Sequence, residues 1–331
     1  MINNILCFLL CLLLLPSLSK SKYTSKQCSP KEKKALLQIR KELNNSDYLS
    51  TWTSNNDCCD FIDVNCDQTH HVTRLTLFGD QHSGRISPAI GDLNFLESIV
   101  LVNLPNVYGP IPPTIAKITK LEDLTISNTN VSGQIPDSLG RLPRLLTLDL
   151  TDNKLSGPIP ASLSQLRKLL FLYLTGNQLT GPIPDSFGSF KQHPSLFLGR
   201  NQLTGKIPPS LAAFDISILD LSGNKLTGDA SLLFTSNKTT QQTLYLSSNY
   251  LSFNLTKVDH FPPQLTTLDL SHNNIYGSLP NSLTTLDLVV FNVSYNRLCG
   301  KIPVGGKLQN FDSSSYNHNK CLCGSPLHSC K

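Results

Sequence analysis

The sequence has little charge and few aromatic residues. Of its 331 residues, 15% are charged and 7% aromatic, with one Trp and one Met, and the formal net charge is +5. It contains no run of five basic residues, so the composition gives nucleic-acid binding no support. The eight His residues show no fixed relation to a nucleophile motif, which gives Ser-His-Asp catalysis no support either. Nothing in the sequence indicates a cofactor or a metal.

Long apolar runs are also missing. The longest, Ile5 to Leu15, is followed by Pro16 and by small residues at Ser17 and Ser19. It is shorter than the roughly 20 residues that a membrane-spanning helix needs. We therefore predict a signal peptide over residues 1–19 and no membrane span, and we expect a secreted, monomeric product. The C-terminal tail shows no hydrophobic anchor signal.

Cysteine is concentrated at the two ends of the predicted mature chain. Eight residues remain after the signal peptide, in two groups of four, and clustered Cys in a secreted chain indicate disulfides. Each group allows three pairings, but a bond between the adjacent Cys58 and Cys59 would be strained. We favour Cys28–Cys58, Cys59–Cys66, Cys299–Cys321 and Cys323–Cys330. Zinc is the alternative, although Cys321-x-Cys323 does not have zinc-finger spacing.

One pattern recurs ten times between Val72 and Pro303, and residues 145–160 show it most clearly as L-x-x-L-x-L-x-x-N-x-L-x-G-x-I-P. Its glycine position recurs every 23 to 25 residues, which is typical of leucine-rich repeats. We predict an α/β fold: a right-handed solenoid of ten repeats over residues 71–303. Disulfide-bonded caps should cover its ends, with a helix in the cap of residues 20–70 and a second cap at 299–331.

The repeat predicts which side chains are buried. Its L-x-L segment should form a short strand of a concave parallel sheet, with the leucines inside and the intervening residues outside. The following Asn should be buried and bonded to the backbone, forming a ladder. Thr129 and Leu104 occupy two of these Asn positions, and we expect the longer repeat containing Leu104 to be irregular. The Gly-x-Ile-Pro segment predicts a second short sheet on the flank.

The outward positions are the candidate binding residues. The row between the two leucines carries aromatics and acids that the core does not require, and aromatics and Arg are enriched at protein interfaces. The alternative is an ordinary solvated sheet. Six candidates belong to this row: Asp149, Tyr173, Phe197, Asp220, Tyr245 and Asp269. Four more lie beside it: Asp123, Phe171, Arg200 and His272.

Two other chemistries are less well supported. Asp220 and Asp269 should lie about 10 Å apart, near the upper limit for an inverting glycosidase pair, but an open sheet offers no enclosed cleft. We therefore predict no catalytic residue and no enzyme activity. Basic residues recur on the flank and suggest contact with an anionic polysaccharide such as pectin: Arg85, Lys154, Lys206, Lys225, Arg297 and Lys301. Five N-glycosylation motifs occur, at Asn44, Asn130, Asn237, Asn254 and Asn292.

Several segments outside the repeat pattern resemble one family, the plant polygalacturonase-inhibiting proteins. The resemblance covers the whole predicted mature chain. The segments are Cys28-Ser29-Pro30, Asp57-Cys58-Cys59-Asp60, Gly228-Asp229-Ala230-Ser231, the stretch from Asn292 to Gly300, that from Ile302 to Gln309, and Cys321-Leu322-Cys323-Gly324. The chain departs from the family at Phe61-Ile62-Asp63, where relatives often carry Trp.

The resemblance implies a defence protein of the plant cell wall or apoplast. Such proteins bind fungal, and sometimes insect, endopolygalacturonases through the concave residues and occlude the substrate cleft. One alternative is a soluble module that recognises a peptide or receptor, as in the ectodomains of plant receptor kinases. Another is a relative recruited to ice binding or developmental control; a regular row of Thr or Asn would favour ice binding, but the candidate rows are mixed.

Overall fold

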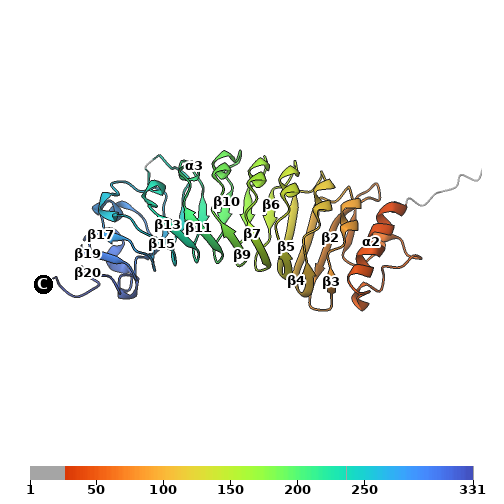
Figure 1. Ribbon diagram of the computed structural model, residues 1–331, viewed down its shortest axis with the longest axis horizontal. Helices are drawn as coiled ribbons and strands as arrows, with labels where there is room; N and C mark the ends of the chain where they lie inside the picture. The colour runs from red at the N-terminus through yellow and green to blue at the C-terminus, as the bar shows by residue number, and fades with distance from the viewer. Residues whose placement is uncertain (1–26, 236, 331) are drawn as a thin grey trace, which may run out of the picture.

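The computed structural model describes residues 27–235 and 237–330, so the predicted signal peptide lies outside it. The coils stack side by side into an elongated, gently curved solenoid, from α2 at one end to β20 at the other (Figure 1). Within the described residues, no helix has both the length and the apolar character to cross a bilayer.

The L-x-L segments form the main sheet, as predicted. Neighbouring strands are parallel and in register, so that Leu148, Leu172 and Leu196 lie side by side and are buried. The first strand, β1, is the exception, since it pairs antiparallel with β2. The strands are β1 (Val64–Cys66), β2 (Val72–Phe78), β4 (Ser98–Gly109), β5 (Asp123–Gly133), β6 (Thr147–Asp149), β8 (Phe171–Tyr173), β10 (Ser195–Phe197), β12 (Ile218–Asp220), β14 (Thr243–Tyr245), β16 (Thr267–Asp269) and β18 (Val290–Asn292).

The predicted second set of strands is present on the flank. Its strands lie slightly earlier than predicted: they run from the residue after the ladder Asn to the repeat glycine or one residue beyond, as in β7, so the Ile-Pro of the Gly-x-Ile-Pro segment follows the strand and is not part of it. Strands β4 and β5 are long enough to enter both surfaces. The others are β3 (Ser83–Arg85), β7 (Lys154–Pro158), β9 (Gln178–Gly181), β11 (Gln202–Lys206), β13 (Lys225–Gly228), β15 (Tyr250–Leu251), β17 (Tyr276–Gly277), β19 (Arg297–Lys301) and β20 (Cys321–Cys323).

Short helical turns complete the coils. Most begin directly after a proline and bury one apolar side chain each, such as Leu139 or Phe187. All are 3₁₀ turns except α3 (Pro209–Ala212): Pro88–Asp92, Pro113–Lys117, Asp137–Arg141, Ala161–Gln165, Asp185–Ser189, Ser231–Leu233, Leu255–Lys257 and Asn281–Thr285.

The asparagine ladder forms as predicted. Asn201 is buried, its Nδ2 donates to the carbonyl oxygens of Leu174 and Leu198 at 2.9 and 3.1 Å, and its Oδ1 accepts from Leu179 N at 3.0 Å. These bonds satisfy the polar amide inside an apolar stack. Thr129 supplies a hydroxyl to the ladder by donating to Asn153 Oδ1. Where Leu104 replaces Asn, the pairing of β4 with β5 shifts register, so that repeat is irregular.

The N-terminal cap lays helix α2 (Pro30–Glu42) over the first coil and buries Ala35, Leu36 and Ile39. Phe61 is buried and stacks on Trp52 at a centroid distance of 5.6 Å. The indole Nε1 donates to Ile62 O at 2.9 Å. Two short 3₁₀ turns, Asp47–Leu49 and Cys58–Asp60, complete this cap.

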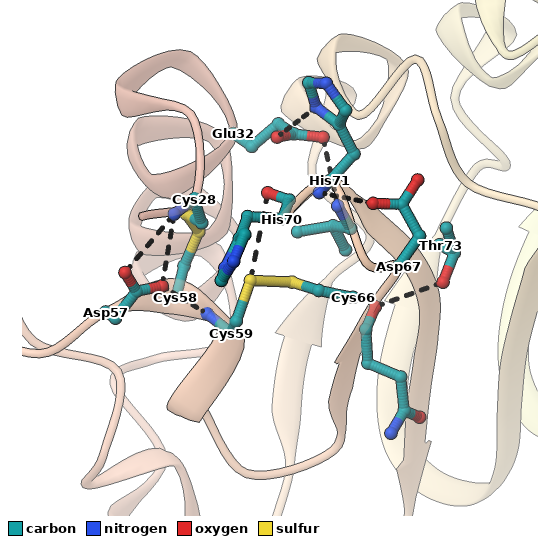
Figure 2. The surroundings of a disulfide bond; sticks show 12 residues. Cys28, Glu32, Asp57, Cys58, Cys59, Cys66, Asp67, His70, His71 and Thr73 are labelled. Atoms are coloured by element: carbon teal, nitrogen blue, oxygen red, sulfur yellow. Dashed lines mark hydrogen bonds and ion pairs between the residues drawn. A yellow bond between two sulfur atoms is a disulfide. The ribbon is translucent and has the colours of Figure 1, made fainter. Parts of the chain in front are cut away.

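A buried carboxylate connects this cap to the first coil, and two disulfides cross-link the cap internally (Figure 2). Glu32 of α2 is buried; its Oε1 accepts from Val72 N at 3.2 Å, and its Oε2 lies 3.2 Å from His71 Nδ1. The carboxylate of Asp57 accepts from the backbone N–H groups of Cys28 and Cys59. The disulfides here join Cys28 to Cys58 and Cys59 to Cys66.

The C-terminal cap continues the solenoid as a partial eleventh coil. Its Asn319 forms a further rung of the ladder, with Oδ1 accepting from Leu298 N at 3.0 Å and Nδ2 donating to Val293 O at 2.9 Å. Strand β20 extends the flank sheet beyond β19. Disulfides join Cys299 to Cys321 and Cys323 to Cys330, so all eight described cysteines are in disulfides, which removes the zinc alternative for them. The turns Leu308–Asn310 and Ser313–Ser315 precede β20.

Candidate partner-binding surface

The outward row between the two leucines runs the full length of the main sheet. We call it the central row. The strand register places each member beside its counterpart in the next coil, and all ten are half-buried between buried neighbours. Its members are Thr76, Val100, Thr125, Asp149, Tyr173, Phe197, Asp220, Tyr245, Asp269 and Asn292.

Three of the candidate aromatics meet on this surface. The Tyr173 ring stacks on Phe197 at 4.5 Å and lies 6.0 Å from Phe171, nearly parallel to both. Because the rings cover one another, Tyr173 and Phe197 are half-buried and only Phe171 is exposed. Burial, and then the negative charge of Asp149, raise the pKa of the Tyr173 phenol. The three stacked rings of Phe171, Tyr173 and Phe197 form a largely apolar surface, which we call the aromatic platform.

The acids of the central row have a structural role that the sequence analysis missed. Oδ1 of Asp149, Asp220 and Asp269 accepts the backbone N–H two residues later, at 2.9 Å in each case. This local bond fixes the carboxylate where the strand ends. Asn292 accepts in the same way from Ser294. The signal was present in the sequence as a recurring Asp-Leu-Ser/Thr.

Tyr245 lies between Asp220 and Asp269 in the strand register. The two carboxylates are therefore separated by a coil and an aromatic ring on an open sheet. This arrangement offers a contact surface with alternating ring and acid, and it lacks the enclosed cleft in which paired carboxyl groups act on a glycosidic bond.

The candidates beside the central row fall into separate environments. Asp123 is held within the sheet, with one carboxylate oxygen accepting from Ser98 Oγ at 3.1 Å and the other from Thr125 Oγ1 at 3.0 Å. Arg200 forms an ion pair with Asp152 at 3.0 Å, although the two residues stand two repeats apart. The pair spans Gly176, where an added Cβ would collide with Asp152 Oδ1.

His272 lies on the same edge as Arg200, at the position before the ladder Asn. Both residues have left-handed backbone, with φ near 53° and 52°. The His272 ring stacks on Tyr295 of the next coil at 4.1 Å. We call this row of positions the edge row.

The predicted glycosylation sites differ in their surroundings. Asn44 and Asn237 are exposed. Asn130 donates to Pro105 O, while Asn254 Oδ1 accepts from Thr256 N at the start of a helical turn. Asn292 belongs to the central row itself, so a glycan there would occupy the C-terminal part of the concave face.

Basic side chains form a second group on the opposite edge of the sheet, where the chain enters the strands. Among the described residues none of its seven members forms an ion pair with an acid. Three of them, Arg141, Arg167 and Lys191, line one shallow hollow. The group, which the sequence analysis missed, consists of Lys117, Lys120, Arg141, Arg144, Arg167, Lys168 and Lys191.

Comparison with known proteins decides the family. The leucine rich repeat N-terminal domain model matches residues 29–67, and leucine rich repeat models match residues 119–179 and 264–286. The chain is 60% identical to a polygalacturonase inhibitor of Vitis vinifera, covering 93% of this chain and 92% of that one. It is 59% identical to polygalacturonase inhibitor 1 of Arabidopsis thaliana, over 97% and 98% of the two chains. The chain belongs to the polygalacturonase inhibitor family.

Among solved structures, this polygalacturonase inhibitor family member resembles a plant ice-binding protein. The TM-score is 0.88 at 46% identity, with 92% of this chain and 99% of that chain covered. A plant peptide hormone receptor, RGFR1, gives a TM-score of 0.62 at 34% identity, but only 36% of that chain is covered. The repeat architecture is therefore shared with an ice-binding protein and a hormone receptor, so the fold alone does not specify a function.

Proposed function

We propose that this protein is a secreted plant defence protein that binds fungal endopolygalacturonases through its concave face and occludes their substrate cleft. The contacts are made by Asp123, Asp149, Phe171, Tyr173, Phe197, Arg200, Asp220, Tyr245, Asp269 and His272. No bond is made or broken by this protein. The observation that carries the proposal is the platform of Phe171, Tyr173 and Phe197, flanked by fixed carboxylates, in a chain 60% identical to a polygalacturonase inhibitor.

The chemistry of this surface suits a protein partner. Stacked aromatic rings supply contact area at little entropic cost, because they are already ordered before binding. The fixed acids and the Arg200–Asp152 pair supply charges of both signs around this platform. Anchors of this type typically account for most of the affinity of a protein interface.

The test is a reducing-end release assay with purified protein and a panel of fungal endopolygalacturonases. We expect slower release for several enzymes. A matched pair of variants, Tyr173→Ala and Thr76→Ala, separates a role of the platform from a general loss of fold. No inhibition of any enzyme in the panel would refute the proposal.

The second candidate is a recognition module for a peptide or receptor. One relative, 51% identical over 93% of this chain, is named leucine-rich repeat protein FLOR 1 and not an inhibitor. If the panel shows no inhibition, a pull-down from plant extracellular fluid with the same variant pair would examine this alternative.

Three finer points belong to the proposal. The protein acts as a monomer in the cell wall or apoplast, its targets include insect polygalacturonases, and it binds pectin through basic side chains. For pectin, Lys206 and Lys225 on the flank and Arg141 and Arg167 in the hollow are competing sites. Replacing each pair of basic residues with Glu and measuring retention on pectate would identify the site. Unchanged retention of both variants would refute pectin binding through these side chains.

A further inference from the structure

The edge row does not end with the tenth repeat. The rings of His272, Tyr295 and His318 form a continuous stack, with centroids 4.1 Å apart at both steps and interplanar angles of 11° and 18°. His318 belongs to the C-terminal cap, and the other two belong to the last two full repeats. We call these three rings the edge stack.

Backbone geometry explains why a cap residue joins the stack. All three residues have left-handed φ values, 53°, 54° and 60°, so each side chain leaves the coil in the same orientation. The coils are linked by hydrogen bonds from His272 N to Ser294 O and from Tyr295 N to Asn317 O, both 3.0 Å. The partial eleventh coil therefore presents His318 as a further member of the repeat.

The stack is accessible and its charge is uncompensated. All three residues are exposed. Among the described residues, neither His272 nor His318 lies within ion-pair distance of a carboxylate. Imidazole is the side chain whose charge most readily changes between pH 5 and pH 8. When protonated, the two imidazoles would carry positive charges that no carboxylate of the described residues pairs with.

The charged and titratable groups around the stack are few. Asp269 lies on the strand that leads into His272, and its Oδ1 accepts from Ser271 N. Tyr295 separates the two imidazoles. On the cap side, His328 lines the same hollow as His318, and Lys320 is exposed two residues further along. Beyond His272, the next member of the edge row is Ser248, which is uncharged.

We propose that the edge stack extends the partner-binding surface onto the C-terminal cap and binds carboxylates of the target enzyme under acidic conditions. This inference rests on the proposed function. The two imidazoles lie on one exposed edge with the Tyr295 ring between them, so both are accessible to carboxylates on a protein surface. A glycoside hydrolase carries paired Asp or Glu residues at the cleft that the proposed mode of inhibition covers.

The test compares two double variants in binding to one polygalacturonase that the wild type inhibits. His272→Gln/His318→Gln removes both titratable rings of the stack, and His193→Gln/His260→Gln removes two exposed His residues away from it. Dissociation constants are measured at pH 5 and pH 7.5. Each variant is compared with the wild type at the same pH, which cancels titration of the enzyme itself.

We expect the stack variant to bind about tenfold more weakly than the wild type at pH 5 and nearly equally at pH 7.5, because only the charged form attracts carboxylates strongly. The control variant should match the wild type at both values. An equal loss at both pH values, no loss, or the same loss in the control would overturn the inference while leaving inhibition intact. Absence of wild-type binding to every enzyme would overturn the proposed function as well.

Discussion

The first three coils and the six that follow present the same sheet with different side chains. In the first three, the central row holds Thr76, Val100 and Thr125, which are small and uncharged. From Asp149 to Asp269 the row instead consists only of acids and aromatic rings. The strand register continues unchanged across the boundary between them. The strand register therefore does not depend on which side chains point outward, and the two regions differ in the outward residues that we propose for recognition.

The largest expected effect comes from the aromatic platform. Tyr173→Ala removes the ring that contacts both Phe171 and Phe197, and we expect affinity for an inhibited polygalacturonase to fall roughly 30-fold, about 2 kcal/mol, as at a typical interface anchor. Thr76→Ala, in the first three coils, should change affinity less than twofold. Isothermal titration of both variants checks this. Equal losses would mean that the two parts of the face do not differ in function.

We expect a smaller loss of affinity when the charge of one carboxylate in the central row is reversed. Asp220→Lys reverses a carboxylate that Ser222 holds in place, and we expect affinity to fall about tenfold. Thr76→Lys introduces the same charge in the first coil and should have little effect. Association rates at low and high salt, measured by surface plasmon resonance, would show whether the difference is electrostatic. If Thr76→Lys weakens binding as much, contacts extend over the whole face.

The substitution Gly176→Ala tests whether the edge row of the later coils contributes to the stability of the fold. The φ of 72° at Gly176 disfavours any side chain, and a Cβ would displace Asp152 from its pair with Arg200. We expect Gly176→Ala to reduce the free energy of unfolding by about 1 kcal/mol, measured by urea denaturation. Ser248→Ala in the same row is the control and should be neutral. A neutral Gly176→Ala would show that neither the backbone conformation nor the ion pair matters there.

The smallest expected effect concerns acid stability near the first coil. Burial lowers the pKa of His82, and the negative charge of Asp63 only partly opposes this effect. When the pH falls below about 6.5, the folded state therefore binds fewer protons than the unfolded chain. Stability should therefore decrease as the pH falls from 7 to 5. His82→Phe should show a shallower decrease in melting temperature, while His260→Phe, exposed in the later coils, should follow the wild type. Parallel curves for all three proteins would contradict this.

The periodic part of the structure was predictable because every repeat buries the same residue types at the same spacing. The same reasoning reaches Asn319, which stands one repeat length after Asn296 and forms the final rung, although the sequence analysis stopped before it. The acids of the central row were chosen correctly as outward residues, but their bonds to the following backbone N–H groups were overlooked.

Contacts that cross repeats were beyond sequence reasoning. The Arg200–Asp152 pair depends on the absence of a side chain at Gly176, in the repeat between them. The edge stack depends on a cap loop adopting the conformation of a repeat. Neither follows from spacing alone, because both require the relative orientation of side chains on different coils.

The most direct test of the account is amide hydrogen exchange on the complex with an inhibited fungal endopolygalacturonase. We predict protection on binding in β6, β8, β10, β12, β14 and β16 and in the turns that follow them, with β2 and the helical turns of the opposite face unchanged. Protection confined to the first three coils, or to the helical turns, would contradict the claim that the later concave coils hold the enzyme.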